Sequence, residues 1–219
     1  MRVASPTWTT SAMKSARNHK AIAQLWDWFR QNEGVLYETP DDDTLMDEID
    51  AHLDAVHPQL GWELGPTSGR EMFFAISPSL DPELLPVARD VVAEAYRSEL
   101  WEFVVGRQRR PWDIMLEIQW DAELGLPGEE LSLEDWKFVV REGEEGGKPA
   151  IVFVSASCAA MAPEQRDEAA SIVAQGLLGE LVLLEQVESV ELAARLPAGD
   201  DARARPASEL PLAFGLSPL

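Results

Sequence analysis

The chain has 219 residues, of which 46% are hydrophobic, and 39 Asp and Glu outweigh 18 Lys and Arg to give a formal net charge of -21. The hydrophobic content and eight tryptophans predict a globular core and exclude a disordered chain. A negative field of this size repels nucleic acid and anionic membranes and favours a basic partner. An acidic surface that only maintains solubility explains the same charge.

Cysteine usage and hydropathy bear on the compartment. Cys158 is the single cysteine, so no internal disulfide forms, which fits a reducing cytoplasm. The first residues lack the apolar stretch of a secretory signal, and no apolar segment approaches the roughly 20 residues of a membrane helix. These features predict a cytoplasmic protein with no membrane association, and no motif calls for a cofactor.

Two helices are predicted after an N-terminal arm at residues 1–14. The first begins at Ser15 and ends at Gly34, with apolar residues sharing one face: Ile22, Leu25, Trp26 and Phe29. Thr39 and Pro40 are suited to cap and open the second, which ends at His57. Residues 31–69 contain ten acidic residues and neither lysine nor arginine, whereas residues 1–30 are basic.

The best-specified stretch runs from Gly69 to Asp113, and most of it belongs to a unit at residues 60–105. A hairpin is predicted from the apolar runs 60–64 and 71–76 around a Gly-Pro loop. Asp81 and Pro82 are suited to the start of a helix, and 101–105 return as a strand. Residues 136–192 repeat this order with a hairpin, a helix opened by Pro163 and a last strand at 186–192. Duplication and chance similarity both explain the repeat.

The remaining segments are a strand at 114–120, an acidic loop at 121–132 and a C-terminal tail at 197–219 that wraps the surface. Together the elements predict an α+β fold in one domain, residues 15–196. Its sheets are expected to be mostly antiparallel, with helices on one face and two hairpin-helix-strand units, 60–105 and 136–192.

Catalytic and metal sites have weak support. No nucleophile elbow, phosphate-binding loop, dinucleotide fingerprint or zinc-protease motif is present. The run Asp41–Asp43 is explained by the positive end of a helix, and Glu48 and His52 lack an evident third metal ligand. Cys158 follows a strand as a nucleophile can, but a buried structural thiol is the simpler interpretation.

One basic cluster opposes the global charge: Arg107, Arg109 and Arg110, with Trp112 beside them. Arginine makes bidentate contacts with carboxylates and phosphates, so these four residues are the candidate site for an anionic ligand or a partner's acidic groove. Neutralisation of the protein's own acidic second helix is the alternative.

Four short blocks support a resemblance: residues 25–33 (LWDWFRQNE), 70–77 (REMFFAIS), 101–103 (WEF) and 177–180 (LLGE). In this order they resemble a group of uncharacterised bacterial cytoplasmic α+β proteins. Ser77, Pro78 and Ser79 stand where that group has a polar turn. The resemblance implies the fold and assigns no activity to any residue.

Two functions therefore stay open. A non-enzymatic protein-binding factor, regulatory or immunity-type, follows from the charge and the lack of a catalytic constellation. The alternative is a protein that binds a small anionic ligand, or an enzyme, through the cluster from Arg107 to Trp112. A third interpretation assigns the tryptophans to the core and the charge to solubility.

Overall fold

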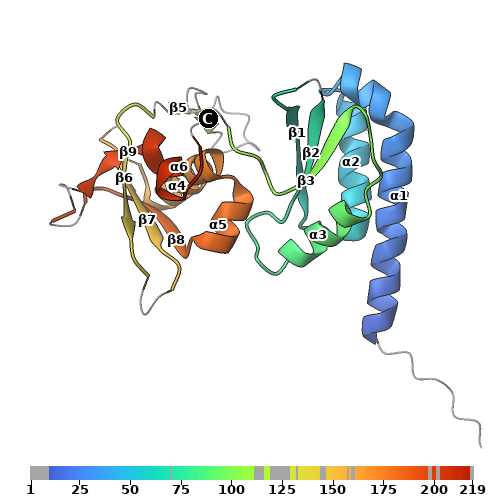
Figure 1. Ribbon diagram of the computed structural model, residues 1–219, viewed down its shortest axis with the longest axis horizontal. Helices are drawn as coiled ribbons and strands as arrows, with labels where there is room; N and C mark the ends of the chain where they lie inside the picture. The colour runs from blue at the N-terminus through green and yellow to red at the C-terminus, as the bar shows by residue number, and fades with distance from the viewer. Residues whose placement is uncertain are drawn as a thin grey trace, which may run out of the picture. The chain divides into compact units, whose positions relative to one another are not determined.

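The computed structural model describes residues 10–69, 71–110, 116–118, 129–131, 133–143, 147–156, 158, 161–196, 199–200 and 203–217. We had predicted a single domain over residues 15–196. Instead the chain divides into two compact units, Met1–Gly106 and Arg107–Leu219. Each unit is described by itself (Figure 1).

Unit 1 begins with two helices, α1 (Thr10–Glu38) and α2 (Asp43–Val56), which lie side by side (Figure 1). The helix α1 already begins within the predicted arm and continues through Gly34, because a glycine inside a helix costs only about 1 kcal/mol and the buried Leu36 lies beyond it. Asp42 caps α2 in place of Thr39, by accepting the N–H groups of Thr44 and Leu45.

The sheet of unit 1 has the order β1 (Gly61–Pro66), β2 (Met72–Ser77) and β3 (Trp101–Val105). The β1–β2 hairpin is antiparallel, with Leu64 opposite Phe74, and β3 pairs with β2 in parallel after the crossover helix α3 (Leu85–Ala93). That helix begins later than predicted, because the carboxylate of Asp81 accepts the N–H of Glu83 in a preceding turn.

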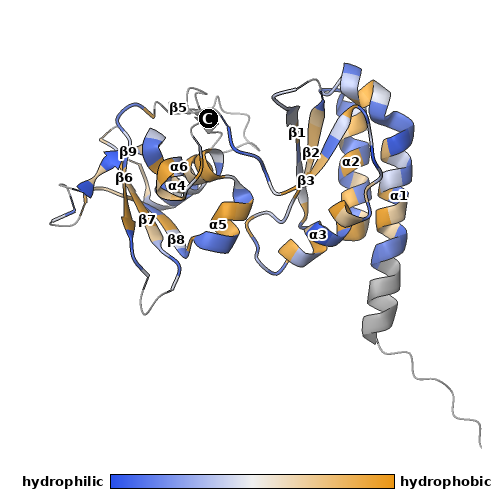
Figure 2. Cartoon of the chain, in the orientation of Figure 1, coloured by the Kyte–Doolittle hydropathy of each residue, from blue (hydrophilic) through white to orange (hydrophobic). Residues whose placement is uncertain are grey.

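All three helices of unit 1 pack on one face of its sheet. Phe74 and Ile76 point to that face and join one core with residues from each helix. Phe29 of α1 lies at the centre, stacked on Phe74 with ring centroids 4.8 Å apart. Figure 2 shows hydrophilic and hydrophobic residues along both α1 and α2, as expected of helices with one buried face.

Unit 2 repeats this arrangement in a four-stranded sheet of order β8-β7-β6-β9. The strands β6 (Lys137–Arg141) and β7 (Ala150–Val154) form an antiparallel hairpin, and β8 (Ser189–Ala193) pairs with β7 in parallel. Two helices, α4 (Pro163–Leu178) and α5 (Glu180–Gln186), connect β7 to β8. A separate pair, β4 (Leu116–Ile118) and β5 (Glu129–Leu131), places a strand where we had predicted a loop.

The C-terminal segment belongs to the core of unit 2, where we had predicted a surface tail. The strand β9 (Arg205–Pro206) pairs with β6, and a 3₁₀ turn (Ala207–Glu209) and the short helix α6 (Leu210–Ala213) follow. Ala207 and Leu210 are fully buried against Phe138, Phe153 and α4. The segment therefore completes the face of the sheet that carries the helices.

The α+β fold and the two hairpin-helix-strand units are confirmed. The sheets are mixed instead of mostly antiparallel, since a returning strand that follows a crossover helix must be parallel to its neighbour. None of the helices in the described part of the chain is long and apolar enough to cross a membrane.

Candidate functional site

The predicted basic cluster begins where unit 2 begins. Arg107 is held at both backbone groups by Glu180: its N–H donates to the Glu180 carboxylate at 2.9 Å, and its carbonyl accepts the Glu180 N–H at 3.0 Å. The Glu180 side chain is fully buried at the start of α5. This pair fixes the first residue of unit 2 to the junction of α4 and α5.

Arg109 closes the C-terminal end of α4. Its Nε donates to the carbonyl of Leu177 at 2.9 Å and its Nη2 to the carbonyl of Ser217 at 2.8 Å. A guanidinium placed on the last carbonyls of a helix satisfies orphan acceptors and interacts favourably with the helix dipole. Burial lowers the pKa of Arg109 from its ordinary value, and its guanidinium binds the chain's own backbone.

The backbone of Arg110 and a special glycine complete this contact. The N–H of Arg110 donates to the carbonyl of Gly176 at 2.7 Å. Between the two helices Gly179 has φ of 78° and ψ of 154°, a conformation open essentially to glycine alone. A Cβ at Gly179 would stand 3.3 Å from Cγ of Arg109. The Leu-Gly-Glu motif is therefore the place where the segment Arg107–Arg110 binds to the α4–α5 junction.

The structure brings Arg107, Arg109 and Arg110 together on the α4–α5 junction, while Trp112 lies outside the described residues. Two pockets formed by described residues are lined by other side chains. Anion binding by these four residues stays a prediction. Their observed contacts show a structural role for the backbone of the segment and for the guanidinium of Arg109.

A polar network that the sequence did not indicate joins α1 to the start of β3. The carboxylate of Glu33 accepts the hydroxyls of Tyr96 at 2.7 Å and Ser98 at 2.6 Å, and the backbone carbonyl of Glu33 accepts the indole N–H of Trp101 at 3.0 Å. The guanidinium carbon of Arg30 lies 4.4 Å from the centre of the Tyr96 ring. No local sequence signal links residues about 65 positions apart.

A pocket of about 310 Å³ lies beside this network, with Tyr96, Trp101 and Phe103 among its lining residues and Arg97 at its exposed edge. Burial first, and then the hydrogen bond and charge of Glu33, raise the pKa of Tyr96 well above its ordinary value. Tyr96 therefore stays protonated at neutral pH and is unsuited to general base catalysis. The hydroxyls of Tyr96 and Ser98 donate hydrogen bonds to Glu33 and so connect α1 to the segment before β3.

The outer face of α2 carries a row of like charges. Asp43, Asp47, Asp50 and Asp54 follow one another at intervals of four, three and four residues, so they share one face of the helix, and all four are exposed. None of the ion pairs found between described residues involves them. Ile49, Leu53 and Val56 form the opposite, buried face.

Indole hydrogen bonds connect α2 to the neighbouring elements. The indole N–H of Trp62 in β1 donates to Asp50 at 2.6 Å, and that of Trp28 in α1 donates to Glu48 at 2.5 Å. The ring of His52 lies 5.2 Å from that of Trp28. Burial lowers the pKa of His52, and the charge of Glu48 partly opposes this shift. These contacts hold α2 in place while its aspartates face outward.

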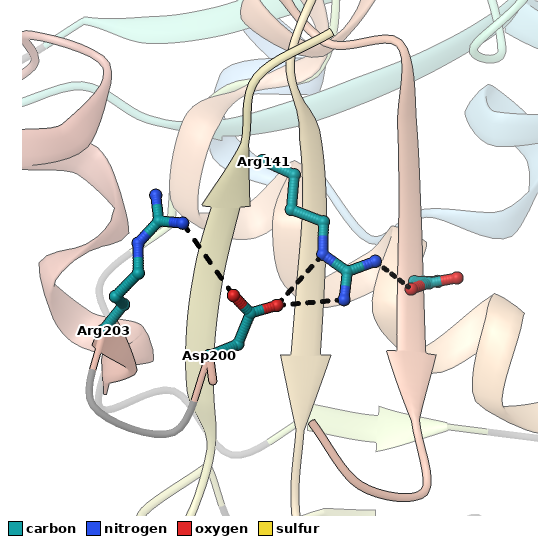
Figure 3. A network of polar contacts seen from close by, with 4 residues as sticks. Arg141, Asp200 and Arg203 are labelled. Atoms are coloured by element: carbon teal, nitrogen blue, oxygen red, sulfur yellow. Dashed lines mark hydrogen bonds and ion pairs between the residues drawn. The ribbon is translucent and has the colours of Figure 1, made fainter. Parts of the chain in front are cut away.

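In unit 2 the charged groups pair with one another. Both Nε and Nη2 of Arg141 bind the carboxylate of Asp200, at 3.2 and 3.0 Å, and Arg203 approaches the other oxygen at 3.8 Å (Figure 3). Arg141 also lies 3.9 Å from Glu191. The network connects β6 and β8 to the segment before β9, so its arginines are occupied within the unit.

The remaining sequence candidates form no site. Cys158 is fully buried in the core of unit 2, where it packs as a structural side chain. Asp42, from the aspartate run, caps α2. Within the described residues, no group of three or more His, Cys, Asp or Glu side chains could hold a metal ion.

Comparison with protein-family models, with curated proteins and with solved structures found no match. The resemblance to a bacterial group accordingly stays a prediction, and the functional argument rests on the geometry of this chain.

Proposed function

We propose that the protein is a non-enzymatic protein-binding factor, regulatory or immunity-type, which receives a basic partner on the outer face of α2. The observation that carries this proposal is the row of four exposed aspartates, Asp43, Asp47, Asp50 and Asp54, on one helical face. We call this row the acidic face. Its field would steer a basic protein toward α2 and speed association.

The positive end of the helix dipole favours Asp43 and the Trp62 indole binds Asp50, but the stability of α2 gives no reason for the complete row. Like charges four residues apart on a helix destabilise it by about 0.2–0.5 kcal/mol per pair, and the acidic face contains two such pairs. Asp54 also lies in the last turn, where the negative end of the helix dipole disfavours a carboxylate. Carboxylates kept in unfavourable positions support a role in binding.

The test compares three forms of the full chain as bait in a lysate of the organism that encodes it. The variant D43N/D47N/D54N removes three charges and leaves Asp50 bound to Trp62. The matched control D167N/E168Q/E188Q removes three exposed charges from unit 2. We expect a basic protein that the wild type and the control retain at physiological salt and that the α2 variant loses.

Equal retention by all three forms, or retention of nothing basic, contradicts the proposal. Salt dependence separates the contributions further. At a salt concentration low enough for the α2 variant still to bind, its affinity should depend less steeply on ionic strength than that of the wild type, because salt has fewer charges to screen.

A further inference from the structure

No strand among the described residues pairs with the outer edge of β1. In β2 the carbonyl of Ile76 accepts the N–H of Gly106, which follows β3, so the even-numbered residues of β2 direct their backbone groups toward β3. The odd-numbered residues then pair with odd-numbered residues of β1. The N–H and C=O groups of Trp62 and Leu64 consequently face outward, and no other described residue binds them.

Unit 2 shows what such an edge can receive. By the same alternation Trp136 and Phe138 of the equivalent hairpin face its outer edge, and there the chain supplies its own strand. The carbonyl of Trp136 accepts the N–H of Ala207, and Phe138 pairs with Arg205 of β9. The guanidinium carbon of Arg205 lies 5.5 Å from the centre of the Phe138 ring. An arginine on the added strand thus covers an aromatic side chain of the edge strand.

The surroundings of β1 suit the same arrangement. The side chains of Trp62 and Leu64 are half-buried on the helix face of the sheet. The Trp62 indole binds Asp50 of the acidic face, so an arginine opposite Trp62 would meet both an aromatic ring and a carboxylate. Cation–π contacts and charge-assisted hydrogen bonds both favour arginine at that position.

We infer that β1 of unit 1 binds an extended, arginine-containing segment of a partner protein, which pairs with Trp62 and Leu64 as β9 pairs with β6. This inference rests on the proposed function and adds where the partner binds and in which conformation. Addition of a strand supplies affinity through main-chain hydrogen bonds, and alternate side chains supply specificity. The exposed edge of β3 is a weaker candidate, since Ser98 already accepts the N–H of Trp101 and the equivalent β8 receives no strand among the described residues.

The experiment follows backbone amides of the ¹⁵N-labelled full chain by NMR. The probe is the blocked peptide Thr-Arg-Val-Arg-Val-Thr at up to millimolar concentration, and its counterpart has glutamate in place of arginine. We expect the arginine peptide to shift the Trp62 and Leu64 amides and to slow their hydrogen exchange. The glutamate peptide should do neither.

A pair of variants separates the backbone of Leu64 from its side chain. L64P removes the outward N–H and the side chain, whereas L64A removes only the side chain; proline is compatible with this alternation because Pro66 already lies on the same side. Loss of one peptide hydrogen bond should weaken binding by L64P about threefold to tenfold relative to L64A. Equal binding by L64P and L64A overturns the inference.

The other outcomes are also decisive. Shifts on α2 without slower exchange at Trp62 and Leu64 overturn the edge inference and leave the acidic face standing. Equal binding of the arginine peptide by the wild type and by D43N/D47N/D54N overturns the proposed function. In that case the exchange rates of the Trp62 and Leu64 amides still test the edge inference by themselves. The inference is also overturned if the arginine peptide does not bind. It is overturned as well if protection of these amides grows with protein concentration alone, because the edge then pairs with a second copy of the chain.

Discussion

The two units share a topology and differ in how they complete it. In unit 2 the hairpin edge is covered by β9, and Ala207 and Leu210 of the same segment enter the core. In unit 1 the equivalent edge at Trp62 and Leu64 is bare among the described residues, and α1 and α2 cover the sheet face instead. The same arrangement of strands therefore occurs once with a strand on the hairpin edge and once with no described strand there.

The tryptophan indoles also differ between the two units. In unit 1 the buried or half-buried indoles of Trp26, Trp28, Trp62 and Trp101 each donate to an acceptor. In unit 2 the Nε1 of Trp136 is buried without an acceptor among the described residues. Unit 1 therefore uses indole hydrogen bonds to connect distant elements, whereas unit 2 uses other contacts, among them the backbone bonds at Arg107 and β9 and the ion pairs of Arg141 with Asp200.

The largest effect is expected from L210A. Leu210 is fully buried in the core of unit 2, and truncation of a buried leucine costs about 2–5 kcal/mol. Hydrogen exchange measured by mass spectrometry should show faster exchange in β6, β7 and α4 and no change in β2. Unchanged exchange in unit 2 would mean that the C-terminal segment lies on its surface and does not stabilise its core.

A second pair of substitutions tests the contact between the segment Arg107–Arg110 and the Leu-Gly-Glu motif. G179A should destabilise unit 2 by about 1–3 kcal/mol, because alanine is strained at φ of 78° and ψ of 154°. G176A is the matched control three residues earlier, where a Cβ meets no atom within 4 Å, and it should stabilise α4 by up to about 1 kcal/mol. Urea unfolding of both variants gives the two signs, and destabilisation by G176A would contradict this account.

A smaller effect, confined to alkaline pH, is expected in unit 1. The raised pKa of Tyr96 stabilises the fold fully below about pH 10, the ordinary value for tyrosine, and this contribution is lost as pH rises further. In Y96F the stability of unit 1 should fall less steeply above pH 10 than in the wild type. Identical pH profiles of Y96F and the wild type would refute the network.

The smallest effect concerns the acidic face. D54N removes one like-charge pair with Asp50 and a carboxylate at the negative end of α2, so unit 1 should gain about 0.2–0.5 kcal/mol. The gain should shrink in 1 M salt, where charges are screened within about 3 Å. Thermal unfolding at two salt concentrations measures it, and a loss of stability would mean that Asp54 has a structural partner.

Local patterns predicted the elements of the repeat, because alternation in β6 and β7 and helical periodicity in α4 depend on neighbours in sequence. They misplaced the start of α3, where Asp81 caps a turn. They also ended α1 at Gly34, although the helix continues to the buried Leu36. Here packing outweighed a local signal of about 1 kcal/mol.

The candidate site was predictable only in part. The acidic run and the basic cluster are visible as composition, but Arg109 binds backbone carbonyls more than 60 residues away, and a helix end offers no signature for such a partner. The same holds for Glu33 with Tyr96. The bare edge of β1 could not be seen either, because strand pairing at one side depends on which segment returns from elsewhere in the chain.

The boundary between the units has one practical consequence. The N–H of Gly106 donates to Ile76 within unit 1, and the N–H of Arg107 donates to the buried carboxylate of Glu180 within unit 2. Hydrolysis of the peptide bond between these two residues would give Arg107 a terminal ammonium in place of this amide, next to the buried carboxylate of Glu180.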